Sequence, residues 1–348
     1  MPQEPIYGDL MQLRTVKVGA VQTRPVLLDS EATLEGIERL AIEAAGAGAG
    51  LIAFPEALIP GYPDWVWRSK PWDESPELFA RLMRESVIVP GPVTERLARL
   101  ASRLSAYLAV GVNERSGSTL YNTLLVFDSS GTLVIHRRKL MPTGPERMVW
   151  GMGDGSTLTV VDTPFGRLGG LICWENYMPL ARAAMYAQGI DILLAPTWDR
   201  GETWVSTLRH IGREGRVFVV GVSSCIRGSD VPADFPGRVG MYGGDDDWMN
   251  DGWSAITDHT GGLLAGPLVN ETGILYAELD ANRVRASRKE FDPTGHYSRP
   301  DVFSLTVNTM PAAAVNFVPP RAEQAHAASS GADTTRFVRA TPRKRRHQ

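Results

Sequence analysis

The sequence has few cysteines and no long hydrophobic run. Two cysteines among 348 residues argue against a disulfide framework and indicate a reducing compartment, so we expect a cytoplasmic protein. No apolar stretch approaches the roughly 20 residues needed to span a bilayer, and the N-terminus lacks a basic patch followed by an apolar core. We therefore expect a chain that neither crosses a membrane nor is exported.

An excess of either charge is also missing. The net charge is −3 and charged residues make up 22% of the chain, so composition gives no reason to expect nucleic acid as a partner. The sequence contains no Walker loop, no dinucleotide-binding glycine motif after a strand, no serine-hydrolase elbow, no H-E-x-x-H and no paired CxxC. Nucleotide-dependent, serine-hydrolase and zinc chemistries therefore lose most of their support.

Strand and helix patterns alternate along most of the chain. Apolar or period-two runs predict strands at 16–22, 51–54, 107–113, 120–127, 132–139, 168–173, 191–195, 218–222, 252–257, 263–265 and 273–279. Amphipathic spacing predicts helices at 30–44, from 75 onwards, and at 94–106, 178–186 and 203–216. These patterns together indicate an α/β protein with a sheet-rich core.

Two segments fall outside this pattern. Residues 227–252 are rich in glycine, proline and aspartate without clear periodicity, so we expect a long loop that serves as a lid or a contact surface. From Arg321 the chain carries seven Lys/Arg against two acidic residues, or 7 − 2 = +5. We expect one folded domain over 14–319 and a disordered basic tail over 320–348.

Three reactive side chains follow predicted strands. Glu56 comes directly after the strand at 51–54, Lys139 ends the strand at 132–139, and Cys173 stands between a strand and a helix that begins near Pro179. Ligands in α/β folds gather at the carboxyl ends of strands. A thiol just before a helix also lies near the positive end of the helix dipole, which favours the thiolate.

Each residue alone also has a simpler interpretation. Glu56 fits a solvated loop acid, Cys173 fits a small buried hydrophobic residue, and the charged run at 136–139 singles out no one cation. Cys225 follows another apolar strand without the same turn and helix, so we expect it to be buried and to take no part in chemistry.

Six motifs follow one another along the chain: FPEALIPGYP (54–63), RRKLMPTGPERMVWGMGDGS (137–156), GGLICWENYMPLAR (169–182), APTWD (195–199), RHIGREGR (209–216) and FDPTGHYSRPD (291–301). With these motifs in this order, the chain resembles the nitrilase superfamily of carbon–nitrogen hydrolases over residues 14 to 310. This resemblance implies a four-layer α-β-β-α sandwich that needs no metal and no organic cofactor.

The resemblance also implies the roles of individual residues. Glu56 is implied as the general base, Lys139 as the cation that stabilises the tetrahedral species, and Cys173 as the nucleophile. A second glutamate maps to Glu146, beside Lys139, and Glu175 is a weaker candidate for organising the cysteine turn.

The motifs CWENYMPLAR and GHYSRPD resemble the nitrile-hydrolysing branch. The implied substrate is a small organic nitrile, and we expect an aryl or arylalkyl group because four aromatic residues adjoin the strand ends: Tyr62, Trp65, Trp174 and Trp198. An amidase, an N-carbamoyl hydrolase, a cyanide-hydrolysing enzyme and a non-catalytic scaffold remain as alternatives. The resemblance further implies a homo-oligomer, including a spiral filament as one form.

Overall fold

The computed structural model describes residues 13–73, 75–244, 246–312 and 315. One compact unit extends to Pro311, and of the second unit, which begins at Ala312, only two residues are described. The predicted domain boundary at 319 and the basic tail at 320–348 lie outside the described residues. The account below concerns the first unit.

The described residues form two mixed sheets. The first has the strand order β13-β1-β2-β3-β4-β5, formed by β1 (Val16–Gln22), β2 (Leu51–Ala53), β3 (Tyr107–Ser116), β4 (Thr119–Phe127), β5 (Leu133–Arg138) and β13 (Gly273–Leu279). The second has the order β10-β11-β9-β8-β7-β6, with β12 paired to β11; its strands are β6 (Val161–Thr163), β7 (Gly166–Gly170), β8 (Ile192–Thr197), β9 (Phe218–Ser223), β10 (Cys225–Arg227), β11 (Trp248–Thr257) and β12 (Leu263–Val269).

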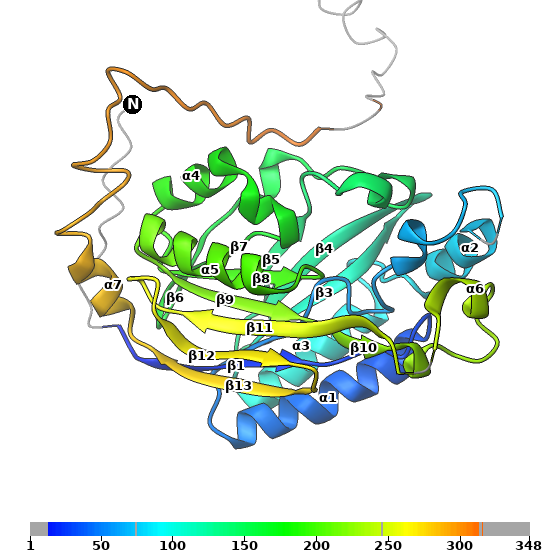
Figure 1. Ribbon diagram of the computed structural model, residues 1–348. Helices are drawn as coiled ribbons and strands as arrows, with labels where there is room; N and C mark the ends of the chain where they lie inside the picture. The colour runs from blue at the N-terminus through cyan, green and yellow to red at the C-terminus, as the bar shows by residue number, and fades with distance from the viewer. Residues whose placement is uncertain (1–12, 74, 245, 313–314, 316–348) are drawn as a thin grey trace, which may run out of the picture. The chain divides into compact units, whose positions relative to one another are not determined.

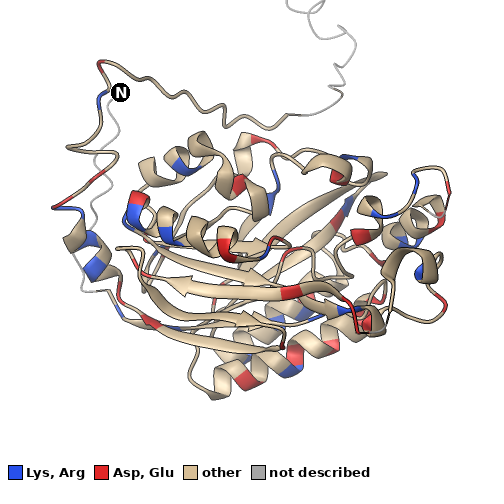
Figure 2. Cartoon of the chain, viewed as in Figure 1, with Lys and Arg blue, Asp and Glu red and all other residues tan. Residues whose placement is uncertain are grey.

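Helices cover the outer face of each sheet (Figure 1). Helices α1 (Ser30–Gly46) and α3 (Pro92–Leu104) pack on the first sheet, and α4 (Pro179–Ala187) and α5 (Glu202–Gly215) pack on the second. The remaining helices are α2 (Ser75–Glu85), α6 (Arg238–Tyr242) and α7 (Ala281–Ser287). The strands between the helical layers are largely free of charged residues (Figure 2). The four-layer α-β-β-α sandwich expected from the sequence is thus confirmed.

Strands buried on both faces explain why the apolar runs are nearly continuous. In β8, Ile192 and Leu194 pack between the two sheets, whereas Leu193 and Ala195 pack under α4 and α5. Successive side chains of a strand point to opposite faces, so each face of β8 meets a different apolar layer. The helices predicted from the sequence are also present, close to their predicted positions. Asp29 caps α1 by accepting a hydrogen bond from the Ala32 amide.

The stretch predicted as a long loop, 227–252, is only partly a loop. This stretch contains α6 and the first half of β11, which pairs with β10 through Cys225–Asp251 and Ile226–Asn250. This part of β11 reads Trp-Met-Asn-Asp-Gly, so the alternation that signals a strand is missing. Neither β6 nor α7 was expected from the sequence, because both are short. None of the described helices combines the length and apolar character needed to cross a membrane.

The topology gathers several strand ends at one edge. Strands β2 and β3 are parallel, as are β7, β8 and β9. Strand β3 passes directly beneath the loop that follows β2: a Cβ on Gly111 would lie 2.2 Å from the Pro55 carbonyl oxygen and 2.8 Å from the Glu56 Cα. Glycine at this position therefore allows the loop carrying Glu56 to rest on the sheet.

Candidate active site

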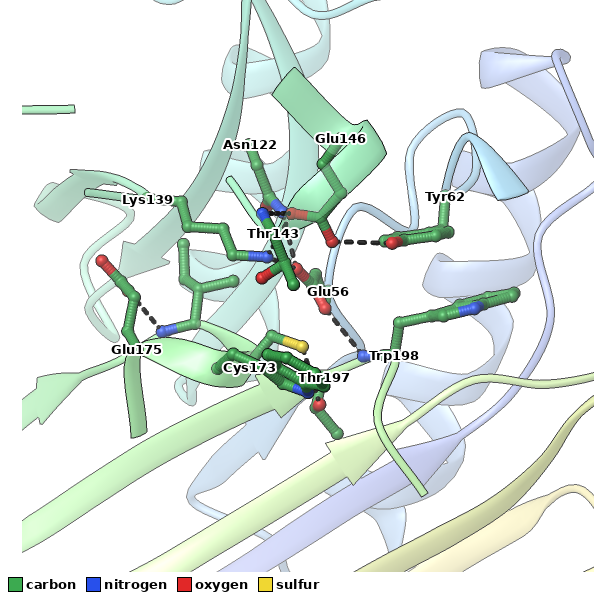
Figure 3. Close-up of polar contacts among 12 residues, drawn as sticks. Glu56, Tyr62, Asn122, Lys139, Thr143, Glu146, Cys173, Glu175, Thr197 and Trp198 are labelled. Atoms are coloured by element: carbon green, nitrogen blue, oxygen red, sulfur yellow. Dashed lines mark hydrogen bonds and ion pairs between the residues drawn. The ribbon is translucent and has the colours of Figure 1, made fainter. Parts of the chain in front are cut away.

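Lys139 joins two carboxylates that come from different parts of the chain. Its Nζ donates hydrogen bonds to Glu56 Oε1 and to Glu146 Oε2, each at 2.8 Å (Figure 3). All three side chains are buried. Burial alone would lower the pKa of Lys139, but the negative charges around it, Glu56 foremost, outweigh burial and raise this pKa well above its usual range. The ammonium therefore stays charged inside the protein.

Glu56 is held at both carboxylate oxygens. Asn122 Nδ2 donates to the same Oε1 at 2.6 Å, and the Trp198 amide donates to Oε2 at 2.7 Å. Burial raises the pKa of Glu56, and the positive charge of Lys139 only partly offsets this effect. A carboxylate with a raised pKa is a stronger base, which suits a group that must accept a proton from a thiol.

Cys173 occupies a strained turn beside these groups. It follows β7, begins the short 3-10 turn Cys173–Tyr177, and has a φ of 53°, a region that non-glycine residues seldom adopt. The Thr197 hydroxyl donates a hydrogen bond to its sulfur at 3.3 Å. Burial, and secondarily the charge of Glu56, raises the pKa of the Cys173 thiol.

The helix-dipole effect, expected from the sequence to favour the thiolate, is therefore outweighed at Cys173. The α-helix proper begins only at Pro179, so Cys173 lies one short turn away from its dipole. Burial beside a carboxylate dominates instead, and the thiol is neutral until a base removes its proton.

Glu175 and Arg137 connect the cysteine turn to the lysine segment. Glu175 accepts hydrogen bonds from the Ile172 amide at 2.7 Å and the Leu140 amide at 2.6 Å, and it forms an ion pair with Arg137 at 2.7 Å. Both charged side chains have 0% exposure. One carboxylate thus fixes the residue before Cys173 and the residue after Lys139 in a single frame.

Glu146 links the charged centre to an aromatic wall. Its Oε2 also accepts from the Thr143 amide, and its Oε1 accepts from the Tyr62 hydroxyl at 2.6 Å. The Tyr62 ring stacks on the Trp198 ring with centroids 4.4 Å apart, and Trp67 Nε1 donates to the Tyr62 hydroxyl. The orientation of this wall therefore depends on Glu146.

A cavity of about 230 Å³ opens onto Cys173 and Glu146. Its wall includes four aromatic side chains, Tyr62, Trp67, Trp174 and Trp198, and its rim includes Arg68 and Arg200. Three of the four aromatic residues predicted from the sequence thus line it. Trp65 instead packs in the cluster that contains Phe235, with only 1% of its surface exposed.

The structure brings Glu56, Lys139 and Cys173, which follow strands, together with Glu146, which only the family resemblance implied. Asn122, Thr197 and Trp67 also belong to the site and were not predicted. A polar residue inside an apolar strand was the only available signal for Asn122. Cys225 is buried, as expected, and lies in β10.

Comparison with known proteins gives a consistent result. Residues 17–289 match the family model described as carbon-nitrogen hydrolase. The chain is 43% identical over 303 residues to an aliphatic nitrilase from Sinorhizobium fredii, covering 86% of this chain and 97% of the relative. It is 41% identical to a bifunctional nitrilase/nitrile hydratase from Nicotiana tabacum, covering 89% and 91%. A solved nitrilase-superfamily structure from Saccharomyces cerevisiae superposes with a TM-score of 0.64 at 21% identity, covering 83% and 99%.

Proposed function

This chain belongs to the carbon–nitrogen hydrolase family and is a nitrilase, and we propose that Cys173 is the nucleophile with which it converts organic nitriles into carboxylic acids and ammonia. The observation that carries the proposal is the buried set of contacts in which Lys139 joins Glu56 and Glu146 beside the cysteine. A nucleophile, a base and a fixed cation are the groups that addition to a nitrile requires.

The first half of the reaction forms a thioimidate. The Cys173 sulfur adds to the nitrile carbon while its proton passes to Glu56, and the nitrile nitrogen takes a proton in return. A water molecule then adds to the thioimidate carbon, with Glu56 accepting a proton from the water. The Lys139 ammonium stabilises the negative charge that develops on the atoms bonded to the thioimidate carbon.

The second half releases both products. Glu56 passes the proton taken from water to the nitrogen, which becomes an amino group. The hydroxyl proton of the tetrahedral species then passes through Glu56 to this nitrogen, ammonia leaves, and a thioester to Cys173 remains. A second water, deprotonated by Glu56, cleaves the thioester to give the carboxylic acid and restores the thiol. One nitrile and two waters thus yield one acid and one ammonia.

Ammonia release from matched panels of nitriles and amides tests this assignment. We expect higher kcat/KM for the nitriles, and we expect Lys139→Met to abolish turnover while the protein stays folded. Faster hydrolysis of the amides would make the protein an amidase instead, and full activity of Lys139→Met would contradict the proposed role of the cation.

We propose that the substrate carries an aryl or arylalkyl group. Support comes from the aromatic cavity wall, in particular the exposed rings of Trp67 and Trp174, each about half accessible. Phenylacetonitrile-like compounds should be turned over with a lower KM than short aliphatic nitriles. Faster turnover of hydrogen cyanide or of short aliphatic nitriles would contradict this substrate class.

Release of an amide is a second activity of the same site. The Nicotiana relative is named as both a nitrilase and a nitrile hydratase. If the tetrahedral species expels the Cys173 thiolate rather than ammonia, the product is the amide. Separation of acid and amide by chromatography after complete conversion measures how the reaction divides.

We propose that the protein forms a homo-oligomer, including an open filament as one form. Support comes from the segment after α7, where Tyr297, Phe303 and Met310 are 62%, 77% and 70% exposed. Apolar side chains exposed in this way are typical of contact surfaces. Light scattering that finds only a 38.0 kDa monomer would refute the proposal.

We further propose a cytoplasmic location. Support comes from the two cysteines, which are both unpaired in the structure. Alkylation of thiols during cell lysis, followed by mass spectrometry, should find both residues reduced, and an oxidised pair would contradict the proposed compartment.

A further inference from the structure

The Thr197 side chain lies at the carboxyl end of β8 and is fully buried. Its Oγ1 is 3.3 Å from the Cys173 sulfur (Figure 3). The same oxygen accepts a hydrogen bond from the Asp199 amide at 2.8 Å. A hydroxyl has one proton to donate and can accept through its lone pairs. Because the Asp199 amide occupies the oxygen as an acceptor, the Thr197 proton remains for the sulfur.

The backbone around Thr197 fixes this donor. Thr197 pairs with Ser223 in the parallel ladder between β8 and β9, and its β-branched side chain has restricted χ1 freedom. The next residue, Trp198, is held through its amide by Glu56. The hydroxyl is therefore set in place before the reaction, as a donor must be if it is to stabilise charge without reorganising.

The reaction places negative charge on this sulfur twice. The sulfur bears charge when the Cys173 proton moves to Glu56, and again when the bond from sulfur to the acyl carbon breaks. The site opposes this charge, because burial and Glu56 both raise the pKa of Cys173, whereas the charge of Lys139 and the Thr197 hydrogen bond act in the opposite direction. A hydrogen bond to a charged acceptor is about twice as strong as a neutral one.

We propose that Thr197 is a further catalytic residue, whose hydroxyl donates to the Cys173 sulfur and stabilises the thiolate as the sulfur attacks and as it leaves. The proposal rests on the role of Cys173 as nucleophile. It can be tested without any nitrile, through alkylation of the thiol.

Thr257 provides a matched control. It is also fully buried, lies at the end of β11 in the same sheet, and donates its hydroxyl over 3.3 Å, but to the Leu208 carbonyl oxygen. Thr257→Val therefore removes a comparable buried hydrogen bond that does not touch the sulfur. Thr197→Ser keeps the hydroxyl and should restore what Thr197→Val loses.

The experiment measures the rate of iodoacetamide alkylation at Cys173, mapped by mass spectrometry, together with kcat and KM for a nitrile. We expect Thr197→Val to lower the alkylation rate and kcat by about 10-fold to 100-fold with little change in KM, the effect of losing a hydrogen bond to a charged group. Thr197→Ser and Thr257→Val should stay within about threefold of the wild-type protein.

Three results would overturn the proposal. Thr197→Val could be alkylated at the wild-type rate, or Thr257→Val could lose as much alkylation rate and kcat as Thr197→Val. Alternatively, near-ultraviolet circular dichroism of Thr197→Val could lose the signal of the stacked Tyr62 and Trp198 rings, which would make Thr197 a support for Trp198 rather than a donor to sulfur. Slow alkylation with unaltered rings would support the proposal even if the protein were inactive on nitriles.

Discussion

Two buried carboxylates pair with neighbouring arginines of β5, but only one of them holds the cysteine turn. Substituting each in turn separates an effect on the position of Cys173 from an effect on stability alone. Glu175 pairs with Arg137 and holds the cysteine turn, whereas Glu114 pairs with Arg138 and accepts from Thr123 within the first sheet. We predict that Glu175→Gln and Glu114→Gln both lower the free energy of unfolding, and that only Glu175→Gln lowers kcat.

The magnitude follows from the donors around Glu175. A glutamine has one acceptor oxygen, so its amide nitrogen must face either the Ile172 amide or the pair formed by the Leu140 amide and Arg137. The substitution also leaves the Arg137 charge buried without its partner, which costs about 3–5 kcal/mol. A shift of about 1 Å in the cysteine turn would reduce kcat by roughly 100-fold.

Urea unfolding followed by circular dichroism gives the stabilities, and ammonia release gives kcat and KM at a temperature where both variants are folded. Glu114→Gln should retain nearly wild-type kcat despite its loss of stability. The reasoning is refuted if Glu175→Gln keeps wild-type kcat, or if Glu114→Gln loses kcat to the same extent.

Three further predictions concern single groups. Cys173→Ala should abolish turnover and any substrate adduct seen by mass spectrometry, whereas Cys225→Ala should leave both largely intact. Hydrogen bonds from His136 and Arg138 outweigh burial and lower the pKa of Glu114 to about 2, below its ordinary 4.5, so its contribution to stability is present above about pH 4.5 and is lost as the pH falls toward 2; acid unfolding of Glu114→Gln should lack this component. Tyr62→Phe, which removes a donor to Glu146, should lower kcat by about tenfold in the ammonia assay.

Much of the fold could be predicted because its strands are buried on both faces. Runs such as 192–195 and 218–222 consist of apolar residues and one glycine, and the helices between them have one apolar stripe. The stretch at 227–252 could not be predicted, because the register of β10 against β11 depends on tertiary contacts such as the Arg227 side chain over the Trp248 ring.

The residues of the active site also divide into those that the sequence indicated and those that it did not. Glu56, Lys139 and Cys173 follow strands, where the chain leaves the core and a reactive group meets a cavity. The choice of Lys139 among its neighbouring cations, and of Glu146, rests on the family resemblance. Asn122 lies within β4, and a polar residue inside a strand has no local sign that tells a partner of the active site from a packed side chain. Thr197 ends β8, and no local sign tells its hydroxyl from that of another threonine at a strand end, such as Thr257. Their roles depend on which strand end lies opposite, and that is set by the assembly of two sheets.

At Cys173 the helix dipole expected from the sequence has a smaller effect on the thiol than burial has. A helix dipole stabilises a nearby charge by about 0.3–1 kcal/mol, and by up to about 2 kcal/mol in partly buried sites. Full burial can shift a pKa by 3–5 units, roughly 4–7 kcal/mol. Cys173 is 4% exposed and lies near Glu56, so burial determines its protonation and the thiol is neutral at rest. Its reactivity must then come from groups that act during the reaction, the base Glu56 and the donor Thr197, rather than from a thiolate formed in advance.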